Sequence, residues 1–247
     1  MIADLAWEEM CATYRALGLA SEGAQSVDWD GVEVICGELP HAISNFAMAR
    51  HVSPGMAQRL VHQTLRRPSF VVYLFADTDD PSHTALQSAG FERVSTLAVM
   101  ALEGAPPPPR TRLPEVHPER AESPAAEREI ARFMMRVFFP RHRDEVREVV
   151  SKVTAGAKLD LYQIRGARQA PVAAVMLARR PSVIGLYNLC VEPALRGKGL
   201  GAAIVYWVIS QAHGLPVTLQ SDVLLQNWYE KLDFVRVGTV GVYGVRS

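Results

Sequence analysis

Three glycines at every second position, Gly197, Gly199 and Gly201, form the part of this sequence best suited to binding chemistry. Arg196 and Lys198 alternate with them, so two cations flank the same short stretch. Glycines let the backbone curl until its N–H groups point to one side, and a helix that follows adds the positive end of its dipole. This combination predicts a binding site for a polyphosphate.

The segments on either side of these glycines predict how the loop is held. Residues 182–191 are an apolar run with a β-branched start, which is typical of a buried strand. Residues 202–212 repeat four aliphatic side chains at helical spacing, namely Ile204, Val205, Val208 and Ile209. The pattern therefore predicts a strand, a glycine loop and a helix in succession.

Two nucleotide-binding patterns can be compared with this loop. A P-loop needs four residues between glycine and Gly-Lys-Ser/Thr, and the sequence has no such segment. Residues 197–202 fit the loose dinucleotide pattern, but dinucleotide folds open with that pattern and need further strand–helix units. Ala202 already lies in the last fifth of the chain, and the strand expected at 216–221 ends without an acid until Asp222. The dinucleotide alternative stays open but is disfavoured.

The segment Arg196-Gly197-Lys198-Gly199-Leu200-Gly201 fits a different pattern, Arg-x-x-Gly-x-Gly/Ala. Here the sequence resembles the GNAT superfamily of acyl-CoA-dependent N-acyltransferases. Leu189-Cys190-Val191, followed by Pro193, resembles the end of the family's fourth strand. Asn227-Trp228-Tyr229 through Phe234 resembles the family's Asn-x-x-Tyr-x-x-x-Gly-Phe helix, with one residue fewer between Asn and Tyr. The resemblance covers residues 183–245.

The resemblance implies an α/β (α+β) fold in which helices flank a mixed, mostly antiparallel sheet, with the family's fourth and fifth strands splayed apart. It also implies acetyl-CoA as the acyl donor and no metal. Tyr229 takes the family's general-acid position. The implied cofactor-binding residues are Leu189, Cys190, Val191, Arg196, Gly197, Lys198, Gly199, Leu200, Gly201, Ala202 and Asn227. Among them, the loop residues would hold the pyrophosphate, Leu189 and Val191 would pair with the pantetheine arm, and Asn227 would contact the CoA arm.

Departures from the family's pattern concern the last helix and the base. Asp233 replaces a glycine, but Asp tolerates the left-handed conformation, so we expect the helix end to be retained. The family's glutamate on the fourth strand is missing, and we nominate no general base. Cys190 could carry the acyl group itself, although a cysteine in an apolar strand is far more often inert core.

An internal repeat relates two parts of the chain at a constant offset. The segment from Ser53 to Phe91 is as long as the segment from Arg196 to Phe234. When Ser53 is placed on Arg196, residues 91–96 fall on 234–239 with four of six identical, and Val99 falls on Val242. Both segments follow the order helix, strand, helix, strand, so we expect two similar domains.

The N-terminal copy lacks the cofactor chemistry of the second. The cationic glycine loop falls on Ser53-Pro54-Gly55-Met56, and Tyr229 falls on Leu86, which cannot donate a proton. We therefore expect a degenerate GNAT-like domain at 1–104, a proline-rich linker at 105–114 and a cofactor-binding domain at 115–247.

Composition excludes several other classes of protein. The 247 residues include 26 basic and 26 acidic side chains, a balance that steers the chain towards neither nucleic acid nor an anionic membrane. No apolar run approaches the ~20 residues of a membrane span, and the N-terminus lacks a basic signal start. The three cysteines are too few and too scattered for a disulfide framework or a zinc site. We expect a cytoplasmic monomer that mimics a dimer of single domains.

These observations predict an N-acetyltransferase that transfers an acetyl group from acetyl-CoA to a primary amine by direct attack. The acceptor, a small molecule or a peptide, and the acyl chain length stay open. The alternative from another class is a non-catalytic acyl-CoA-binding sensor, which the missing glutamate keeps open and Tyr229 disfavours. A scaffold of two degenerate copies is hard to reconcile with so complete a loop.

Overall fold

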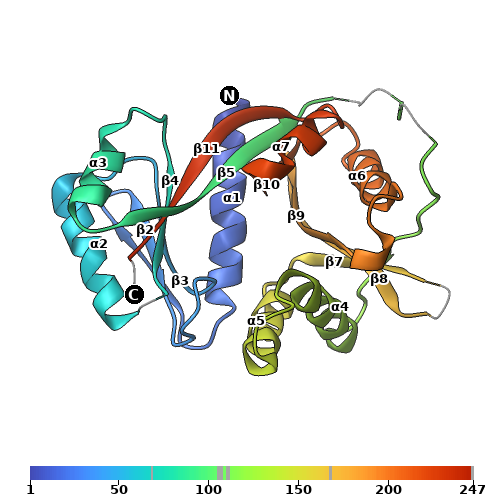
Figure 1. Cartoon of the computed structure of the whole chain (residues 1–247), viewed down its shortest axis with the longest axis horizontal. Helices are drawn as coiled ribbons and strands as arrows, with labels where there is room; N and C mark the ends of the chain where they lie inside the picture. Colours follow the sequence, from blue (N-terminus) through green and yellow to red (C-terminus); the bar gives the residue numbers. More distant parts are fainter. Residues whose placement is uncertain (68, 105–107, 110–111, 167–168, 246–247) are drawn as a thin grey trace. The chain divides into compact units, whose positions relative to one another are not determined.

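The computed structural model describes residues 1–67, 69–104, 108–109, 112–166 and 169–245. These residues form two compact units (Figure 1). Unit 1 comprises Met1–Met100, Gln220–Asn227 and Arg236–Ser247, and unit 2 comprises Ala101–Leu219 and Trp228–Val235. Both units are therefore built from segments that are discontinuous in the sequence.

Unit 1 is a mixed sheet with helices on both faces. Its elements are α1 (Ile2–Leu19), β1 (Gln25–Trp29), β2 (Val32–Cys36), β3 (Asn45–Ala49), α2 (Pro54–Arg66), β4 (Val71–Phe75), α3 (Pro81–Ser88), β5 (Glu92–Leu102) and, much later in the chain, β11 (Val235–Gly244). The strand order is β1-β2-β3-β4-β11-β5. Strands β3 and β4 are parallel, whereas the pairs β1–β2, β2–β3 and β4–β11 are antiparallel.

The alternation of side chains along β4 shows why this sheet needs two helical layers. Val72 and Leu74 join a buried cluster with α2 and α3, including Leu60 and Leu86. Tyr73 and its neighbours on the other face pack instead with the apolar side of α1. Successive side chains of a strand point to opposite faces, and here both faces are apolar, so each must be covered.

Strand β11 lies in unit 1 although the whole series from β6 to α7 separates it from β5 in the sequence. Its Tyr243 is completely buried in the cluster beneath α2 and α3. The Tyr243 hydroxyl lies 2.5 Å from Nδ1 of His83 and accepts from Nη2 of Arg93 at 2.8 Å. His83 Nε2 donates to the Asp77 carbonyl at 2.8 Å, which leaves Nδ1 to accept the hydroxyl proton. A late strand thus completes the core of the unit that contains the start of the chain.

Unit 2 contains a mixed sheet with helices α4, α5 and α6. Its elements are β6 (Glu119–Arg120), α4 (Pro124–Phe138), α5 (Asp144–Gly156), β7 (Asp160–Arg165), β8 (Pro171–Arg180), β9 (Val183–Val191), a 3₁₀ turn (Pro193–Leu195), α6 (Leu200–Gln211), and parts of β10 (Val217–Asp222) and α7 (Val223–Glu230). The strand order is β10-β9-β8-β7-β6, with β9 and β10 parallel and the other pairs antiparallel.

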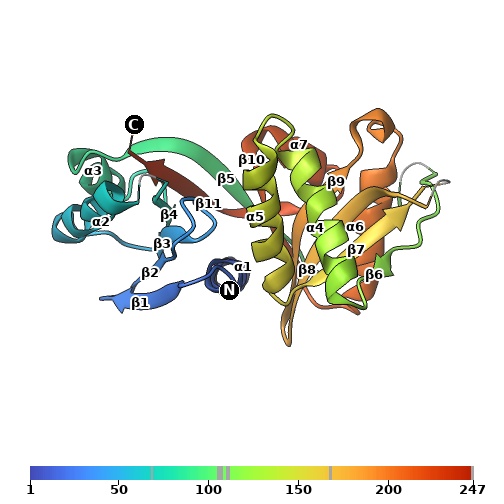
Figure 2. The same cartoon turned by 90° about the horizontal axis from the view of Figure 1, so that it is seen from below.

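Helix starts in both units follow the expected capping chemistry. Ser53 accepts a hydrogen bond from the Met56 N–H at 3.2 Å, and Ser123 accepts one from the Ala126 N–H at 3.2 Å. Proline occupies the first position of each of these helices, α2 and α4. Helices α4 and α5 lie side by side in Figures 1 and 2, joined by Arg132 and Glu148 at 2.8 Å.

The repeated order of elements agrees with the duplication read from the sequence. The series α2, β4, α3, β5 recurs as α6, β10, α7, β11, and β5 and β11 begin at Glu92 and Val235, which are equivalent positions of the repeat. The compact units nevertheless differ from the predicted domains 1–104 and 115–247, because β11 lies between β4 and β5 and pairs with unit 1. Residues 105–107 and 110–111 of the predicted 105–114 linker lie outside the described residues.

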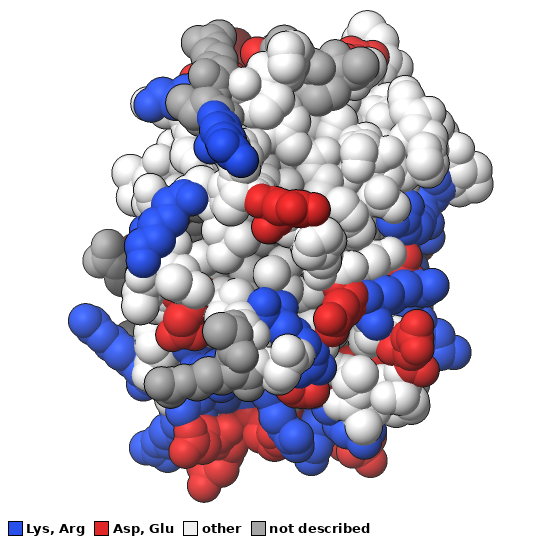
Figure 3. Space-filling model, turned by 90° about the vertical axis from the view of Figure 1, so that its right-hand side faces the viewer, with Lys and Arg blue, Asp and Glu red and all other residues white. Residues whose placement is uncertain are grey.

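The surface shown in Figure 3 carries charges of both signs. Basic and acidic side chains alternate over the lower half of that face, and the upper half is mostly uncharged. Among the described helices, none combines the length and the apolar character needed to cross a bilayer.

Candidate functional site

The glycine loop joins β9 to α6, as the strand–loop–helix pattern predicts. Gly197 and Gly199 have φ values of +75° and +82°, in the left-handed region that favours glycine. Gly199 is the N-cap of α6 and offers no side chain to the helix end. The two glycines are therefore required by the backbone path itself.

The start of α6 offers donors for an anion. The first helical bond in this turn runs from the Ala203 N–H to the Gly199 carbonyl at 2.9 Å. The N–H groups of Leu200, Gly201 and Ala202 precede it and have no partner within the helix. Together with the positive end of the helix dipole, they fit a phosphate group.

Gly201 and Gly199 also lie where side chains would meet neighbouring groups. A Cβ on Gly201 would lie 3.5 Å from the Trp228 ring, an ordinary contact. A Cβ on Gly199 would lie 3.3 Å from Cδ of Pro114 and 3.5 Å from Leu113. The end of the predicted linker thus packs against the cap of α6, so Gly199 is constrained by space as well as by φ.

The two cations of the loop are both exposed. Arg196 Nε donates to the Val191 carbonyl at 3.1 Å, which ties the side chain to the end of β9. Neither Arg196 nor Lys198 forms an ion pair within the described part of the chain. Their charge is thus available to an anionic ligand beside the loop.

Strands β9 and β10 part early, which confirms the predicted splay. Among the described residues their ladder has two pairs, Ile184–Val217 and Gly185–Thr218. Strand β9 nevertheless continues to Val191 and β10 to Asp222. The part of β9 that contains Leu189, Cys190 and Val191 therefore pairs with β8 on one side and, among the described residues, has no ladder partner on the other.

The bulge at Asn188 is a feature of β9 that sequence reasoning missed. The register between β8 and β9 shifts so that Asn188 and Leu189 face the single residue Val175. Asn188 has φ of +49°, and its side chain lies 4.0 Å from the Met176 sulfur. A bulge of this kind turns the strand just before Leu189. The available signal was the asparagine itself, because Asn tolerates left-handed backbone better than most residues.

Tyr229 is 7% exposed and lies in unit 2, as the loop does. Its ring packs edge-on against Trp228 at 4.7 Å and Phe234 at 5.7 Å. Burial raises the pKa of the Tyr229 hydroxyl to about 12. The hydroxyl is thus protonated at neutral pH, as a proton donor must be.

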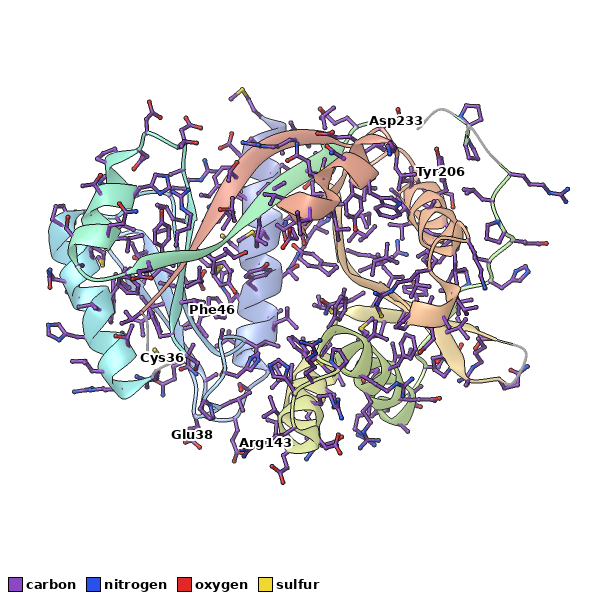
Figure 4. The ribbon with its side chains drawn as sticks, in the orientation of Figure 1. Cys36, Glu38, Phe46, Arg143, Tyr206 and Asp233 are labelled. Carbon is purple, nitrogen blue, oxygen red and sulfur yellow. The ribbon has the colours of Figure 1, made fainter. Side chains whose placement is uncertain are left out.

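Two residues near the end of α7, Asn227 and Asp233, belong to the part of the sequence that departs from the family's pattern. Asp233, which is labelled in Figure 4, adopts φ of +66°. The prediction that aspartate supports this left-handed turn is therefore confirmed. Asn227 is exposed and belongs to unit 1. Its role toward the CoA arm remains a prediction.

Cys190 has properties opposite to those of a nucleophile. It is 4% exposed, and burial raises the pKa of its thiol to about 12. The thiolate is the reactive form of cysteine, and it is scarce at neutral pH in this position. The geometry favours Cys190 as core, against the acyl-cysteine alternative.

Comparisons with known proteins bear on the family. Residues 144–243 match the family model described as acetyltransferase (GNAT) domain. No curated protein matches the sequence. After α6 the chain has just one further strand–helix–strand series among the described residues, which does not support the dinucleotide alternative.

Solved structures share the fold over most of the chain. A GCN5-related N-acetyltransferase from Kribbella flavida has a TM-score of 0.63 at 17% identity, covering 97% of this chain and 95% of that one. A functionally unknown conserved protein from Staphylococcus epidermidis has a TM-score of 0.65 at 15% identity, covering 89% and 93%. A tandem GNAT protein from the clavulanic acid biosynthesis pathway has a TM-score of 0.52 at 13% identity, covering 86% and 77%. The chain therefore carries a GNAT acetyltransferase domain at residues 144–243, within a fold that GNAT proteins, a tandem one among them, share along most of its length.

Proposed function

We propose that this protein is an N-acetyltransferase that transfers the acetyl group of acetyl-CoA to a primary amine by direct attack. The observation that supports this most strongly is the start of α6, where a glycine cap leaves three N–H groups open beside Arg196 and Lys198. The residues fit the pyrophosphate of acetyl-CoA in both charge and backbone geometry.

Each group of residues has a distinct task in this proposal. When bound, acetyl-CoA supplies an activated thioester. The N–H groups of residues 197–202 hold the pyrophosphate, and Lys198 adds charge. The stretch of β9 at Leu189 and Val191, which has no ladder partner on its β10 side among the described residues, orients the pantetheine arm and polarises the acyl carbonyl with a backbone N–H. Tyr229 gives its phenolic proton to the departing sulfur.

The acceptor in this proposal is a small-molecule or peptide amine, and the protein acts as a monomer in the cytoplasm. The monomer is supported by the duplication, because one chain already contains two copies of the α2–β5 series. Light scattering of the 27.2 kDa chain tests it directly. A stable dimer at micromolar concentration would refute this part of the proposal.

Calorimetric titration with acetyl-CoA tests the cofactor site. We expect one site per chain and a three- to tenfold loss of affinity in Lys198→Ala, roughly the value of one exposed charge-assisted contact. Lys152→Ala removes an exposed lysine from α5 and serves as the matched control, with unchanged affinity. A well-folded protein that fails to bind acetyl-CoA would overturn the proposal.

A panel of primary amines, followed by release of CoA, separates an enzyme from a sensor. Tyr229→Phe keeps the ring that packs against Trp228 and Phe234 and removes the proton. We expect its kcat to fall by about 10²-fold with acetyl-CoA affinity unchanged. Tight binding without turnover on any amine would favour the sensor alternative.

A further inference from the structure

A pocket of about 580 Å³ lies in unit 1, far along the sequence from the glycine loop. It is lined by one face of the β1–β2 hairpin, by residues 37–40 after β2, and by the last turn of α2. Its volume is within the range of small-molecule sites. Figure 4 labels two of its residues, Cys36 at the end of β2 and Glu38 in the loop that follows.

The floor of the pocket is apolar because of the strand register. Val27 and Trp29 project from alternate positions of β1, and Val34 faces Val27 across the hairpin. Strand β1 is the edge of the sheet, and α2 ends at Arg66. The hairpin is therefore incompletely covered, and Val27 is 48% exposed. Apolar surface of this kind is stabilised when a ligand removes it from water.

Two arginines form one wall of the pocket. Arg66 makes no ion pair in the described part of the chain. Arg67 donates through Nη1 to Gln63 at 3.1 Å, whereas its Nε–H is shielded from solvent and has no acceptor among the described residues. A buried donor without an acceptor is energetically unfavourable. Glu38 is the single acid among the described lining residues, so the pocket carries a net positive charge.

We propose that this pocket binds an organic anion, with a carboxylate or phosphate group at Arg66 and Arg67 and a compact apolar body against Val27 and Trp29. A planar guanidinium matches a carboxylate or phosphate with paired hydrogen bonds, and the exposed Arg66 at the pocket wall is accessible to such an anion. All lining residues belong to unit 1, whereas the loop at 196–202 belongs to unit 2. The pocket is thus a second binding site, and it does not depend on the proposed acetyl transfer.

Calorimetric titration of the full chain without CoA tests the site, with phenylacetate and phenyl phosphate as probes. We expect saturable binding of at least one anion at one site per chain, and binding at least tenfold weaker for 2-phenylethanol, which keeps a phenyl ring without the charge. Arg66→Gln with Arg67→Gln should weaken binding at least tenfold. Arg236→Gln, the same change at an exposed position of unit 1 outside the pocket, should leave it unchanged.

Alkylation of Cys36 gives a second measurement that needs no variant. Its sulfur lies at the pocket wall, 3.7 Å from Gln63 Oε1, so a bound anion should slow its modification by iodoacetamide at least threefold.

The variant Lys198→Ala tests whether the anion binds in unit 1 and not at the glycine loop. We expect it to keep full anion binding. Absence of saturable binding by both anions, equal binding of 2-phenylethanol, unchanged binding in a folded double variant, or loss of binding in Lys198→Ala would each overturn the proposal. If the double variant does not fold, the proposal is tested by whether the bound anion slows the alkylation of Cys36, and an unchanged rate would overturn it.

Discussion

Helices α2 and α6 have equivalent places in the two copies, yet the backbone N–H groups at their starts differ in whether they are hydrogen-bonded. At α2, Pro54 has no N–H, the Met56 N–H is taken by Ser53, and the Val52 N–H just before the helix is taken by Ser82 at 2.9 Å. At α6, Gly199 caps the helix without a side chain, and the following N–H groups stay open. The start of α2 thus has a side-chain cap for one of its N–H groups, whereas the start of α6 has none, as the proposed anion site requires.

The strands beside these helix ends differ in the same sense. Strands β3 and β4 keep four ladder pairs, from Phe46–Val71 to Ala49–Leu74. Strands β9 and β10 keep two among the described residues, and β9 is further disturbed by the bulge at Asn188. The strands β3 and β4 of the first unit thus stay paired where the corresponding strands β9 and β10 part. The comparison teaches that the proposed binding site lies where backbone groups lack partners, whereas the corresponding backbone groups of the first copy are paired within the fold.

The largest expected effect concerns the core of unit 1, which β11 completes. Tyr243→Ala removes a fully buried ring together with the hydroxyl that contacts both His83 and Arg93. We expect a loss of about 3–5 kcal/mol in the free energy of unfolding, measured by urea denaturation. Tyr243→Phe keeps the ring and should cost only about 1–2 kcal/mol. A small cost for the alanine variant would contradict the role of β11 in unit 1.

Thiol reactivity sharpens the contrast between the two copies. Burial raises the pKa of both thiols, but Cys36 is only half-buried at the pocket of unit 1, whereas Cys190 in β9 is buried and its pKa rises from 9.0 to about 12. At pH 8 we expect Cys36 to be alkylated at least about tenfold faster than Cys190, followed by mass spectrometry. Because the folded pKa is raised, the stability contributed by the neutral Cys190 thiol is full below pH 9 and is lost as pH rises towards 12. Rapid alkylation of Cys190 in the folded protein would revive acyl-cysteine chemistry.

Replacing one glycine of each copy by alanine tests whether the backbone at that position requires a glycine. Gly199→Ala forces a side chain into φ of +82° and towards Pro114, and we expect about a tenfold loss of acetyl-CoA affinity. Gly55→Ala lies in the first turn of α2 with open space around its Cβ. That change should leave binding intact and be neutral or stabilising by up to about 1 kcal/mol. Equal effects of the two changes would erase the distinction between the copies.

The smallest expected effect is at the cap of α2. Ser53→Ala removes the hydrogen bond to Met56 and should cost about 1 kcal/mol of stability, measured by thermal denaturation. Acetyl-CoA binding should not change, because this helix end is not the binding one. If Ser53→Ala weakened binding as much as Lys198→Ala does, the N-terminal copy would have to contribute to the cofactor site.

The sequence alone was sufficient for features that depend on local chemistry. The left-handed Asp233 and the strand–loop–helix around Gly199 each depend on a few neighbouring residues. Strand β1, in contrast, was missed. Four of its five residues are exposed, so it lacks the buried alternation that marks a half-buried strand.

The position of β11 could not be read from local chemistry. Residues 91–96 and 234–239 are so similar that β5 and β11 carry nearly the same strand preference. The two strands differ in the residues that they contact far away in the sequence. Tyr243 finds His83 and Arg93, whereas its counterpart in the repeat, Met100, lies 3.8 Å from Ser221. The pocket at Arg66 and Arg67 likewise depends on where α2 ends relative to β1, which no short window of sequence contains.

The placement of β11 has a consequence for the nascent chain. Strand β5 ends at Leu102 and β11 begins at Val235, so more than half of the chain is synthesised between them. At a synthesis rate of about 5–20 residues per second, β4 and β5 wait roughly seven to twenty-seven seconds for the strand that separates them. During that interval both present unpaired edges, the kind of surface that recruits the wrong strand from another chain. A ribosome that pauses before Val235 would lengthen this exposure, so the yield of soluble protein should depend on translation speed across the second copy.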